Sequence, residues 1–304
     1  MKAVLLREAG GPERLRVEEI PLPTAGPGEV VVKVEAVSIN PVDFKTRQGG
    51  GFRDALGAPP WILGWDVSGV VVSAGPGAFR FREGDAVFGL VRFPAPGRTY
   101  AEYTAVPEAD LAPRPSRLDS VTAAAIPLAG LTGWQALRLA GLKSGERVLI
   151  LGGAGGVGHL AIGISRAWGA DVSATASAAK APFVRERGAQ PLDYRADWPL
   201  GTAPFDAVLN TVGPEAWAQA RSAVRSGARV VHIAGPAGTH PVEGVSEQRH
   251  LVRPDAASLE ELAALVLSGT VKPAVERVYP MTEMAAAHAR LETGRVSGKL
   301  VLTW

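Results

Sequence analysis

The 304-residue sequence contains no cysteine. This absence excludes disulfide bonds, catalysis by a thiolate, and any zinc or iron–sulfur site that is ligated by cysteine. Histidine is also scarce, and His159, His232, His240, His250 and His288 show no spacing that is typical of metal ligands. The sequence therefore predicts a protein without a bound metal.

Long hydrophobic runs are absent as well. No stretch reaches the roughly 18 consecutive apolar residues that a membrane-spanning helix needs. The N-terminal segment MKAVLLREAGGPERLRV becomes charged too early for a secretory signal. We therefore expect a cytoplasmic protein that does not bind a membrane.

Charge of either sign is in little excess. The 32 basic and 30 acidic residues leave a net charge of +2, and the basic residues are scattered rather than interleaved with aromatic residues. A nucleic-acid partner is therefore not expected. With 46% hydrophobic residues, the chain can bury one large core or two smaller ones. The composition predicts an ordered globular protein, with two domains as the first expectation.

Two patterns of secondary structure divide the sequence. Before residue 119, short segments rich in β-branched residues alternate with proline and glycine, which predicts a partly open barrel or sandwich. After it, apolar strands alternate with amphipathic helices, which predicts a doubly wound parallel sheet. The pattern changes again near residue 258, and we expect the chain to return there to the first domain. The predicted α/β protein has a mostly β domain at 1–118 plus 258–304 and a cofactor domain at 119–257.

A glycine-rich segment, GGAGGVG, lies at residues 152–158. Its Gly153, Gly155 and Gly158 form the pattern G-x-G-x-x-G between a predicted strand and a predicted helix that ends at Gly169. Small residues there permit a tight turn and let the backbone and the helix N-terminus approach a pyrophosphate. A merely flexible turn is the alternative, and the absence of a following Lys-Ser or Lys-Thr excludes a P-loop. The predicted dinucleotide-binding residues are Gly153, Ala154, Gly155, Gly156, Val157 and Gly158.

The next predicted strand indicates which dinucleotide is bound. NAD sites usually carry an acidic residue at its end, but no acidic residue occurs between Asp171 and Glu186. Ser177 and Lys180 follow that strand instead, and both side chains can bind the 2′-phosphate of NADPH. The alternatives are a helix N-cap for Ser177 and a solvated lysine at a helix start for Lys180. The sequence therefore favours NADPH.

Several segments together resemble the medium-chain dehydrogenase/reductase superfamily, in its zinc-less quinone oxidoreductase branch. They are GPGEVVVKVEAVSINPVDFKTRQG, PPWILGWDVSGVVVSAGPGAFRFREGDAVFG, YAEYTAVPEADLAPRP, AAAIPLAGLTGWQAL, GGAGGVGHLAI and VSGKLVL, and they occur in family order over almost the whole chain. The resemblance implies a GroES-like catalytic domain, a Rossmann domain for NADPH, and a homodimer, for which the segment ARVVHI is an expected pairing edge. The zinc enzymes of the superfamily carry Cys where Asn40 stands and His-Glu where Trp65-Asp66 stands, so catalytic zinc is not expected.

The resemblance also implies roles for single residues. Asn40, Asp43, Trp65 and Thr132 are the candidates for facing the nicotinamide or the substrate in a cleft between the domains. Structural roles are the alternatives: a turn residue for Asn40, a cap for Asp43, and a cap or core hydroxyl for Thr132. Tyr194 is expected beside the 2′-phosphate unless it is a plain edge-strand tyrosine, and Lys299 near the cofactor unless it is a surface lysine. The other cofactor-binding residues that the resemblance implies are Asn210, Val212, Ile233, Ala234, Gly235, Leu251 and Val252.

Three hypotheses about function follow. The first is an NADPH-dependent quinone reductase, in which water protonates the hydroquinone anion, because no general acid is evident and Tyr-x-x-x-Lys is absent. The second is an NADPH-dependent reductase of enones or 2-alkenals. The third is an NADPH-binding structural or regulatory protein with little turnover.

Overall fold

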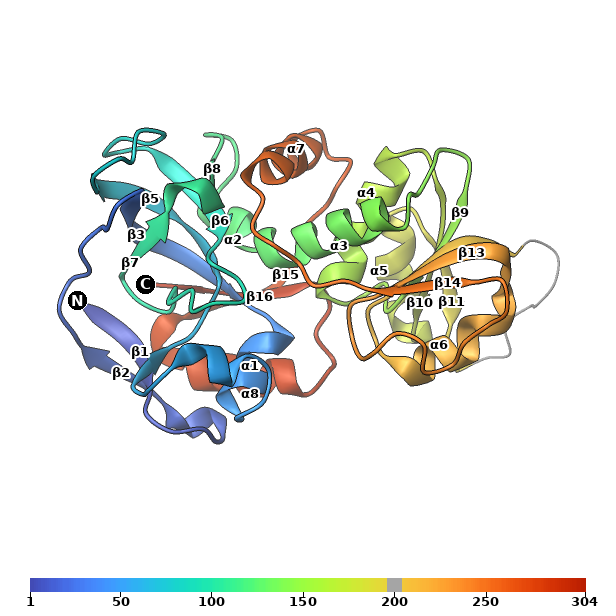
Figure 1. Ribbon diagram of the computed structural model, residues 1–304, viewed down its shortest axis with the longest axis horizontal. Coiled ribbons are helices and arrows are strands. Elements are labelled where there is room, and N and C mark those ends of the chain that lie inside the picture. The colour runs from blue at the N-terminus through green and yellow to red at the C-terminus, as the bar shows by residue number, and fades with distance from the viewer. Residues whose placement is uncertain (196–203) are drawn as a thin grey trace. The chain divides into compact units, whose positions relative to one another are not determined.

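The computed structural model in Figure 1 describes residues 1–195 and 204–304. They form two compact units, unit 1 with residues 1–131, 253–264 and 274–304, and unit 2 with residues 132–252 and 265–273. Two of the boundaries between the units lie within helices, namely α3 (Pro127–Leu139) and α7 (Ala256–Leu267). The boundaries predicted from the sequence, 118/119 and 257/258, differ from these. A change of periodicity shows where the type of secondary structure changes, but it does not show which core a helix packs against.

Unit 1 is mostly β. One sheet has the order β15-β16-β3-β5-β6-β8, with β7 also paired to β3, and a second sheet has the order β2-β1-β4. The C-terminal strand β16 runs antiparallel to β3, with Leu300 opposite Ile39, so the predicted return of the chain to its N-terminal part is confirmed (Figure 1). The strands are β1 (Lys2–Leu6), β2 (Leu15–Glu19), β3 (Glu29–Ile39), β4 (Trp61–Ile62), β5 (Asp66–Ala74), β6 (Ala86–Leu90), β7 (Tyr103–Pro107), β8 (Leu111–Pro113), β15 (Val275–Pro280) and β16 (Lys299–Thr303).

The long strand β3 organises the core of unit 1. Val30, Val32 and Val34 are buried in the main apolar cluster together with residues of β5, β6 and β16. Three helices accompany these sheets: α1 (Pro41–Arg47), α2 (Ser120–Ala124) and α8 (Met284–Glu292). Because α1 begins two residues after the end of β3, the β3 backbone places Asn40 and Asp43 next to the core.

Unit 2 contains a six-stranded sheet in which every pair of neighbours is parallel. Its order is β11-β10-β9-β12-β13-β14, which confirms the predicted doubly wound cofactor fold. The strand β9 reads as a continuous apolar run because it is central and covered on both faces. The elements are β9 (Arg147–Leu151), α4 (Gly156–Ala167), β10 (Asp171–Ala176), α5 (Ala181–Glu186), β11 (Gln190–Asp193), β12 (Phe205–Asn210), α6 (Pro214–Ala220), β13 (Val224–His232) and β14 (Ser246–Arg249).

The region after β12 differs from the sequence expectation. The sequence PEAWAQARSAVRSG predicts a helix over 214–227. This prediction is wrong, because α6 ends at Ala220 and β13 already begins at Val224. The polar, exposed start of β13 has the composition of a helix end, and the short strand β14 carries too little apolar pattern to predict. The expectation that ARVVHI is an edge strand is also wrong, since β13 pairs with β12 and β14. Among the described strands of this sheet the edges are β11 and β14, and the homodimer stays a prediction.

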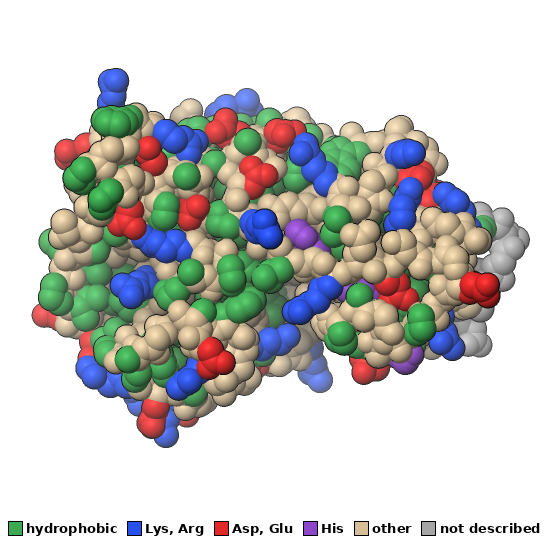
Figure 2. All heavy atoms as spheres, in the orientation of Figure 1, with side chains coloured by type: hydrophobic (Ala, Val, Ile, Leu, Met, Phe, Trp, Pro, Cys, Tyr) green, Lys and Arg blue, Asp and Glu red, His purple; other side chains and the backbone are tan. Residues whose placement is uncertain are grey.

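Two surface features agree with the composition. No helix in residues 1–195 or 204–304 is long and apolar enough to cross a membrane. On the face in Figure 2, Lys and Arg side chains are interspersed with Asp and Glu, as expected from the nearly balanced charge. This face therefore shows no continuous basic surface of the kind that binds nucleic acid.

Candidate functional site

Four neighbouring strands of unit 2 end in register. Leu151 of β9 lies opposite Asn210 of β12, Asn210 opposite His232 of β13, and His232 opposite Arg249 of β14. The loops that follow them lie along one edge of the sheet, here called the carboxyl edge. Ligands of open α/β sheets bind at such an edge. The predicted cofactor-binding residues in these loops are Gly153–Gly158, Val212, Ile233–Gly235, Leu251 and Val252.

The glycine loop has the geometry that a dinucleotide requires. Gly152 has φ +86°, and a Cβ atom on Gly158 would lie 2.2 Å from the Gly152 carbonyl oxygen. A Cβ atom on Gly153 would lie 2.5 Å from the Cβ of Ala174 in β10. Larger residues therefore do not fit between β9, β10 and α4. The N-cap Gly155 has no side chain to satisfy the first N–H groups of α4, so this helix end can receive an anion.

The residues that are expected at the 2′-phosphate follow a second pair of strands. Ala176 at the end of β10 lies opposite Asp193 at the end of β11, so Ser177 and Tyr194 leave the sheet side by side. Ser177 occupies the N-cap position of the turn 178–180, but its side chain makes no capping hydrogen bond there. Lys180 closes that turn. Both residues thus lie in the turn that follows β10, and their contact with a 2′-phosphate stays a prediction.

Apolar side chains are exposed at the same edge. Among the described residues of unit 2, Leu139, Tyr194, Val212 and Leu251 are the large hydrophobic side chains with high exposure, and the last three are predicted cofactor contacts. Val212 is 58% exposed. Of these three, Val212 adjoins the glycine turn, since a Cβ atom on Gly152 would lie 2.9 Å from Val212 Cγ2. Val252, in contrast, is buried, and its predicted contact with the cofactor stays a prediction.

A cluster of buried polar side chains lies in unit 1 at the positions where zinc enzymes hold their metal. Asp66 accepts hydrogen bonds from Asn40 Nδ2 and from the Leu128 N–H, each at 2.7 Å, and from the hydroxyl of Ser38. The Lys299 ammonium donates to Asn40 Oδ1 and to the Ile39 carbonyl, and lies 3.7 Å from an Asp66 oxygen. The charge of Lys299 therefore balances that of Asp66.

The position of Lys299 excludes one of the interpretations from the sequence. Its side chain is 3% exposed, so the surface-lysine interpretation is wrong. Burial lowers the pKa of Lys299, although Asp66 and Asp43 oppose the shift. A contact between Lys299 and the cofactor stays a prediction. The sequence did not single out Asp66 as the centre of this cluster, because its partners come from residues 38, 40, 128 and 299 and meet only in the fold.

The remaining candidates for facing the nicotinamide or the substrate, Asp43, Trp65 and Thr132, are all buried. Asp43 caps α1, since its Oδ2 accepts the Asn40 N–H at 2.7 Å, and so the structural alternative is realised. Burial raises the pKa of Asp43 to about 7. Trp65 is buried and donates its indole N–H to the Ala95 carbonyl at 2.7 Å. Thr132 lies within α3, 6% exposed, and is therefore not a helix cap. Contact of Asn40 and of these three residues with the nicotinamide or the substrate stays a prediction.

Asn40 and Asp66 stand where the resemblance places zinc ligands in the related zinc enzymes. Within residues 1–195 and 204–304, no group of three or more His, Asp and Glu side chains is arranged to hold an ion. Asn40 donates a hydrogen bond to Asp66 and accepts one from Lys299, and Lys299 also forms an ion pair with Asp66. The side chains there are thus saturated by protein partners.

Known proteins match both halves of the chain. The family model of the alcohol dehydrogenase GroES-like domain matches residues 26–116, and that of the zinc-binding dehydrogenases matches residues 188–302. The chain is 35% identical to the 2-methylene-furan-3-one reductase of Solanum lycopersicum over 99% of its own length and 79% of the relative. It has the same identity and coverage with the chloroplastic NADPH-dependent alkenal/one oxidoreductase of Arabidopsis thaliana.

A solved structure extends the match to the whole fold. The quinone oxidoreductase from Coxiella burnetii superposes with a TM-score of 0.93 at 33% identity, and the match covers 100% of this chain and 99% of the other. The resemblance that the sequence motifs indicated is confirmed by these matches. The chain is therefore an oxidoreductase of the medium-chain dehydrogenase/reductase superfamily, and it belongs to the quinone oxidoreductase-like branch.

Proposed function

We propose that the chain is an NADPH-dependent quinone oxidoreductase that works without a metal. The observation that carries this proposal is the carboxyl edge of unit 2, where a glycine turn without room for side chains adjoins Ser177 and Lys180. The absence of an acidic residue after β10 favours the phosphorylated dinucleotide. The likeness to the Coxiella burnetii quinone oxidoreductase over the whole chain supports the choice of acceptor.

In this proposal, residues of unit 2 bind the cofactor, and a polar cluster of unit 1 orients Asn40. The N–H groups at the start of α4 bind the pyrophosphate, and Ser177, Lys180 and Tyr194 bind the 2′-phosphate and the adenosine. Bound NADPH supplies a hydride from its nicotinamide ring. The cluster of Asn40, Asp66 and Lys299 holds the Asn40 amide in one orientation. A quinone that accepts a hydride becomes a hydroquinone anion, which takes its proton from water.

The first experiment tests the cofactor. We expect NADPH to bind at least tenfold more tightly than NADH, a ratio of about the size of one charge-assisted contact. The substitution Lys180→Ala should remove most of that preference in a fluorescence titration. Lys143→Ala is the matched control, because Lys143 is an exposed lysine of the same unit at the start of β9, away from the carboxyl edge. Equal binding of both dinucleotides, unchanged in Lys180→Ala, would contradict the 2′-phosphate role.

A second candidate function is the reduction of enones or 2-alkenals. It is favoured by the 35% identity with the two plant relatives, whose names describe reductases of such substrates. Consumption of NADPH with a small quinone, compared with a 2-alkenal at equal concentration, separates the two. Faster turnover of the alkenal would replace the first proposal with the second. Tight NADPH binding without turnover of either substrate would favour the third hypothesis, an NADPH-binding structural or regulatory protein.

A further inference from the structure

Three buried polar side chains form a continuous hydrogen-bonded row across three strands of unit 2. Asn210 ends β12, His232 ends β13, and Glu247 lies in β14. Asn210 Nδ2 lies 3.0 Å from His232 Nδ1, and His232 Nε2 lies 3.0 Å from Glu247 Oε2. The side chains of His232 and Glu247 are 1% and 7% exposed. This row is buried directly beneath the carboxyl edge.

Asn210 connects the row to the loop after β12. Its Oδ1 accepts the N–H groups of Val212 and Gly213, each at 3.1 Å, and its Nδ2 donates to the Gly213 carbonyl at 2.8 Å. Three hydrogen bonds from one amide therefore define the path of residues 211–213. Only one orientation of the amide makes all three, and that orientation points an N–H donor at His232.

Glu247 connects the row to the loop after β13. The oxygen that receives His232 Nε2 also accepts the Gly238 N–H at 3.1 Å. The predicted cofactor residues Ile233, Ala234 and Gly235 lie between His232 and Gly238 along the chain. One row of side chains thus reaches both loops in which those residues lie.

The donors and acceptors determine the protonation state of His232. Since Asn210 Nδ2 is a donor, His232 Nδ1 has to accept, and the single proton of the neutral ring lies on Nε2 and is donated to Glu247. Burial lowers the pKa of His232, although Glu247 opposes the shift. The Trp217 ring of α6 packs against the imidazole in a T-shaped contact with a centroid distance of 6.0 Å. A proton on Nδ1 would set two donors against each other.

We propose that His232 and Glu247 are positioning residues for the dinucleotide: His232 holds the Asn210 amide, and Asn210 and Glu247 in turn hold the loops after β12 and β13 in the conformation that binds the cofactor. Protonation of His232 turns the amide away and weakens binding. This inference rests on the proposed function, since it assumes that NADP(H) binds at the carboxyl edge. It adds a control of affinity by residues that do not touch the ligand.

A pair of variants separates positioning from packing. His232→Leu removes the acceptor and leaves the Asn210 donor unpaired, so NADPH affinity should fall roughly tenfold. His232→Asn supplies an amide oxygen near the position of Nδ1 and should recover most of that loss. His240→Gln is the control, because it removes a histidine elsewhere in the same unit, and its affinity should equal that of the wild type.

The pH profile is measured with NADP⁺, which survives in acid. As the pH falls below 6.5, down to about pH 4, the wild type should lose more affinity than His232→Asn does. The 2′-phosphate of the ligand titrates in the same range, so the compared quantity is the difference between the two proteins. Nitrogen NMR of the imidazoles in the ligand-free protein should show His232 as the Nε2–H tautomer.

Several results would overturn the proposal. They are an Nδ1–H tautomer, wild-type affinity in His232→Leu, or the same pH profile in wild type and His232→Asn. If His232→Leu does not fold, Glu247→Gln replaces it. The glutamine retains an acceptor but removes the charge, so NADPH affinity should fall below that of the wild type, and wild-type affinity in Glu247→Gln would overturn the proposal. Failure of the wild type itself to bind either dinucleotide would refute the proposed function, whereas normal binding that is indifferent to these variants refutes only the positioning role.

Discussion

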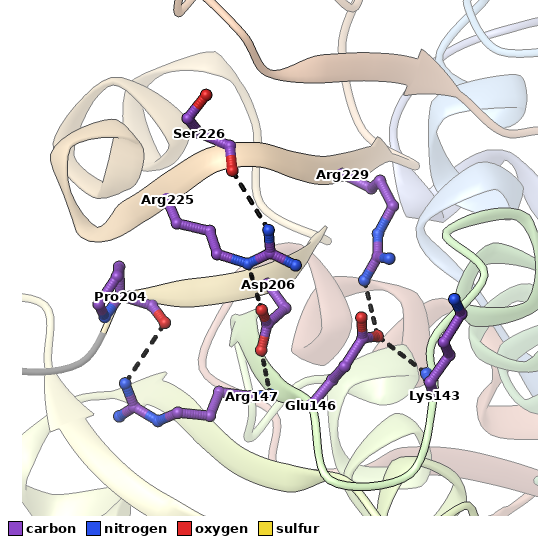
Figure 3. Close-up of polar contacts among 8 residues, drawn as sticks. All are labelled: Lys143, Glu146, Arg147, Pro204, Asp206, Arg225, Ser226 and Arg229. Atoms are coloured by element: carbon purple, nitrogen blue, oxygen red, sulfur yellow. Dashed lines mark hydrogen bonds and ion pairs between the residues drawn. The ribbon is translucent and has the colours of Figure 1, made fainter.

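In the six-stranded sheet of unit 2, the edge formed by the starts of the strands and the edge formed by their ends differ in how their polar groups are satisfied. At the start of the strands, Asp206 accepts the Arg147 N–H at 2.7 Å and the Arg225 guanidinium, and Glu146 accepts Arg229 and the Lys143 N–H (Figure 3). Each of these two carboxylates has both a side-chain and a backbone donor. This edge, here called the amino edge, is therefore closed by its own charges.

The carboxyl edge has the opposite composition. It has glycine where the amino edge has ion pairs, exposed Val212 and Leu251 where the amino edge has arginine, and a helix start without a capping side chain. Both edges belong to the same strands, so neither the fold nor the apolar core requires this contrast. The amino edge is thus closed by ion pairs, and the carboxyl edge is where we propose that the dinucleotide binds.

Closing the glycine turn should have the largest effect. In Gly158→Ala the new Cβ atom would lie 2.2 Å from a backbone oxygen, so the loop has to move and NADPH affinity should fall roughly 100-fold. Fluorescence titration measures the affinity and thermal unfolding checks the fold. Gly50→Ala is the control, because its Cβ atom would approach backbone no closer than 3.4 Å. A folded Gly158→Ala protein with wild-type affinity would show that the turn does not bind the dinucleotide.

A buried carboxyl in unit 1 should respond to pH in the opposite sense to the ion pairs of the amino edge. Burial raises the pKa of Asp43 from 3.8 to about 7, so the folded state retains a proton that the unfolded state loses. Its contribution to stability is therefore full below pH 3.8 and is lost as the pH rises through about 7. Asp43→Asn should remove this loss and raise the melting temperature by a few degrees at about pH 8, relative to the wild type.

The control for that change is Asp54→Asn, since the Asp54 side chain is 99% exposed. Its melting curve should follow that of the wild type at every pH. If Asp43→Asn and the wild type lose stability in parallel as the pH rises, Asp43 is ionised in the folded protein and does not retain a proton.

At the amino edge we expect a smaller loss of stability and no loss of binding. Burial raises the pKa of Glu146, but the hydrogen bonds from Arg229 and the Lys143 N–H outweigh it and lower the pKa below 4.5. Glu146→Gln should therefore cost about 1 kcal/mol of unfolding free energy at neutral pH. Because the pKa is lowered, the difference should disappear as the pH falls below 4.5. Urea unfolding measures it, and a change in NADPH affinity would contradict the separation of the two edges.

The sequence predicted the parts of the molecule that depend on neighbours along the chain. Strand, glycine turn and helix from β9 to α4 follow from one local pattern, and so does the position of Ser177 after β10. The return of β16 to β3 was also predicted, because its pattern changed near residue 258. The motifs that resemble the superfamily then predicted the family to which the chain belongs.

What the sequence did not predict depends on contacts between distant residues. Asp66 is recognised as the centre of its cluster only when Ser38, Leu128 and Lys299 come together around it. His232 and Glu247 have no motif, since a histidine in an apolar strand resembles any core residue. The start of β13 was mistaken for helix because Arg225 and Ser226 are polar for a reason outside the local pattern, the pairing of Arg225 with Asp206 at the amino edge.

The smallest expected effect concerns the open surface itself. Val212 is 58% exposed and has its backbone held by Asn210, so Val212→Ser should leave the melting temperature unchanged. NADPH affinity should fall roughly threefold, because the ligand would lose part of an apolar contact. Val278→Ser tests the same change at a 44% exposed valine of unit 1 and should alter neither property. Equal NADPH affinity in Val212→Ser and the wild type would mean that exposure at the carboxyl edge is incidental, and that the contrast with the amino edge lies in the glycine turn alone.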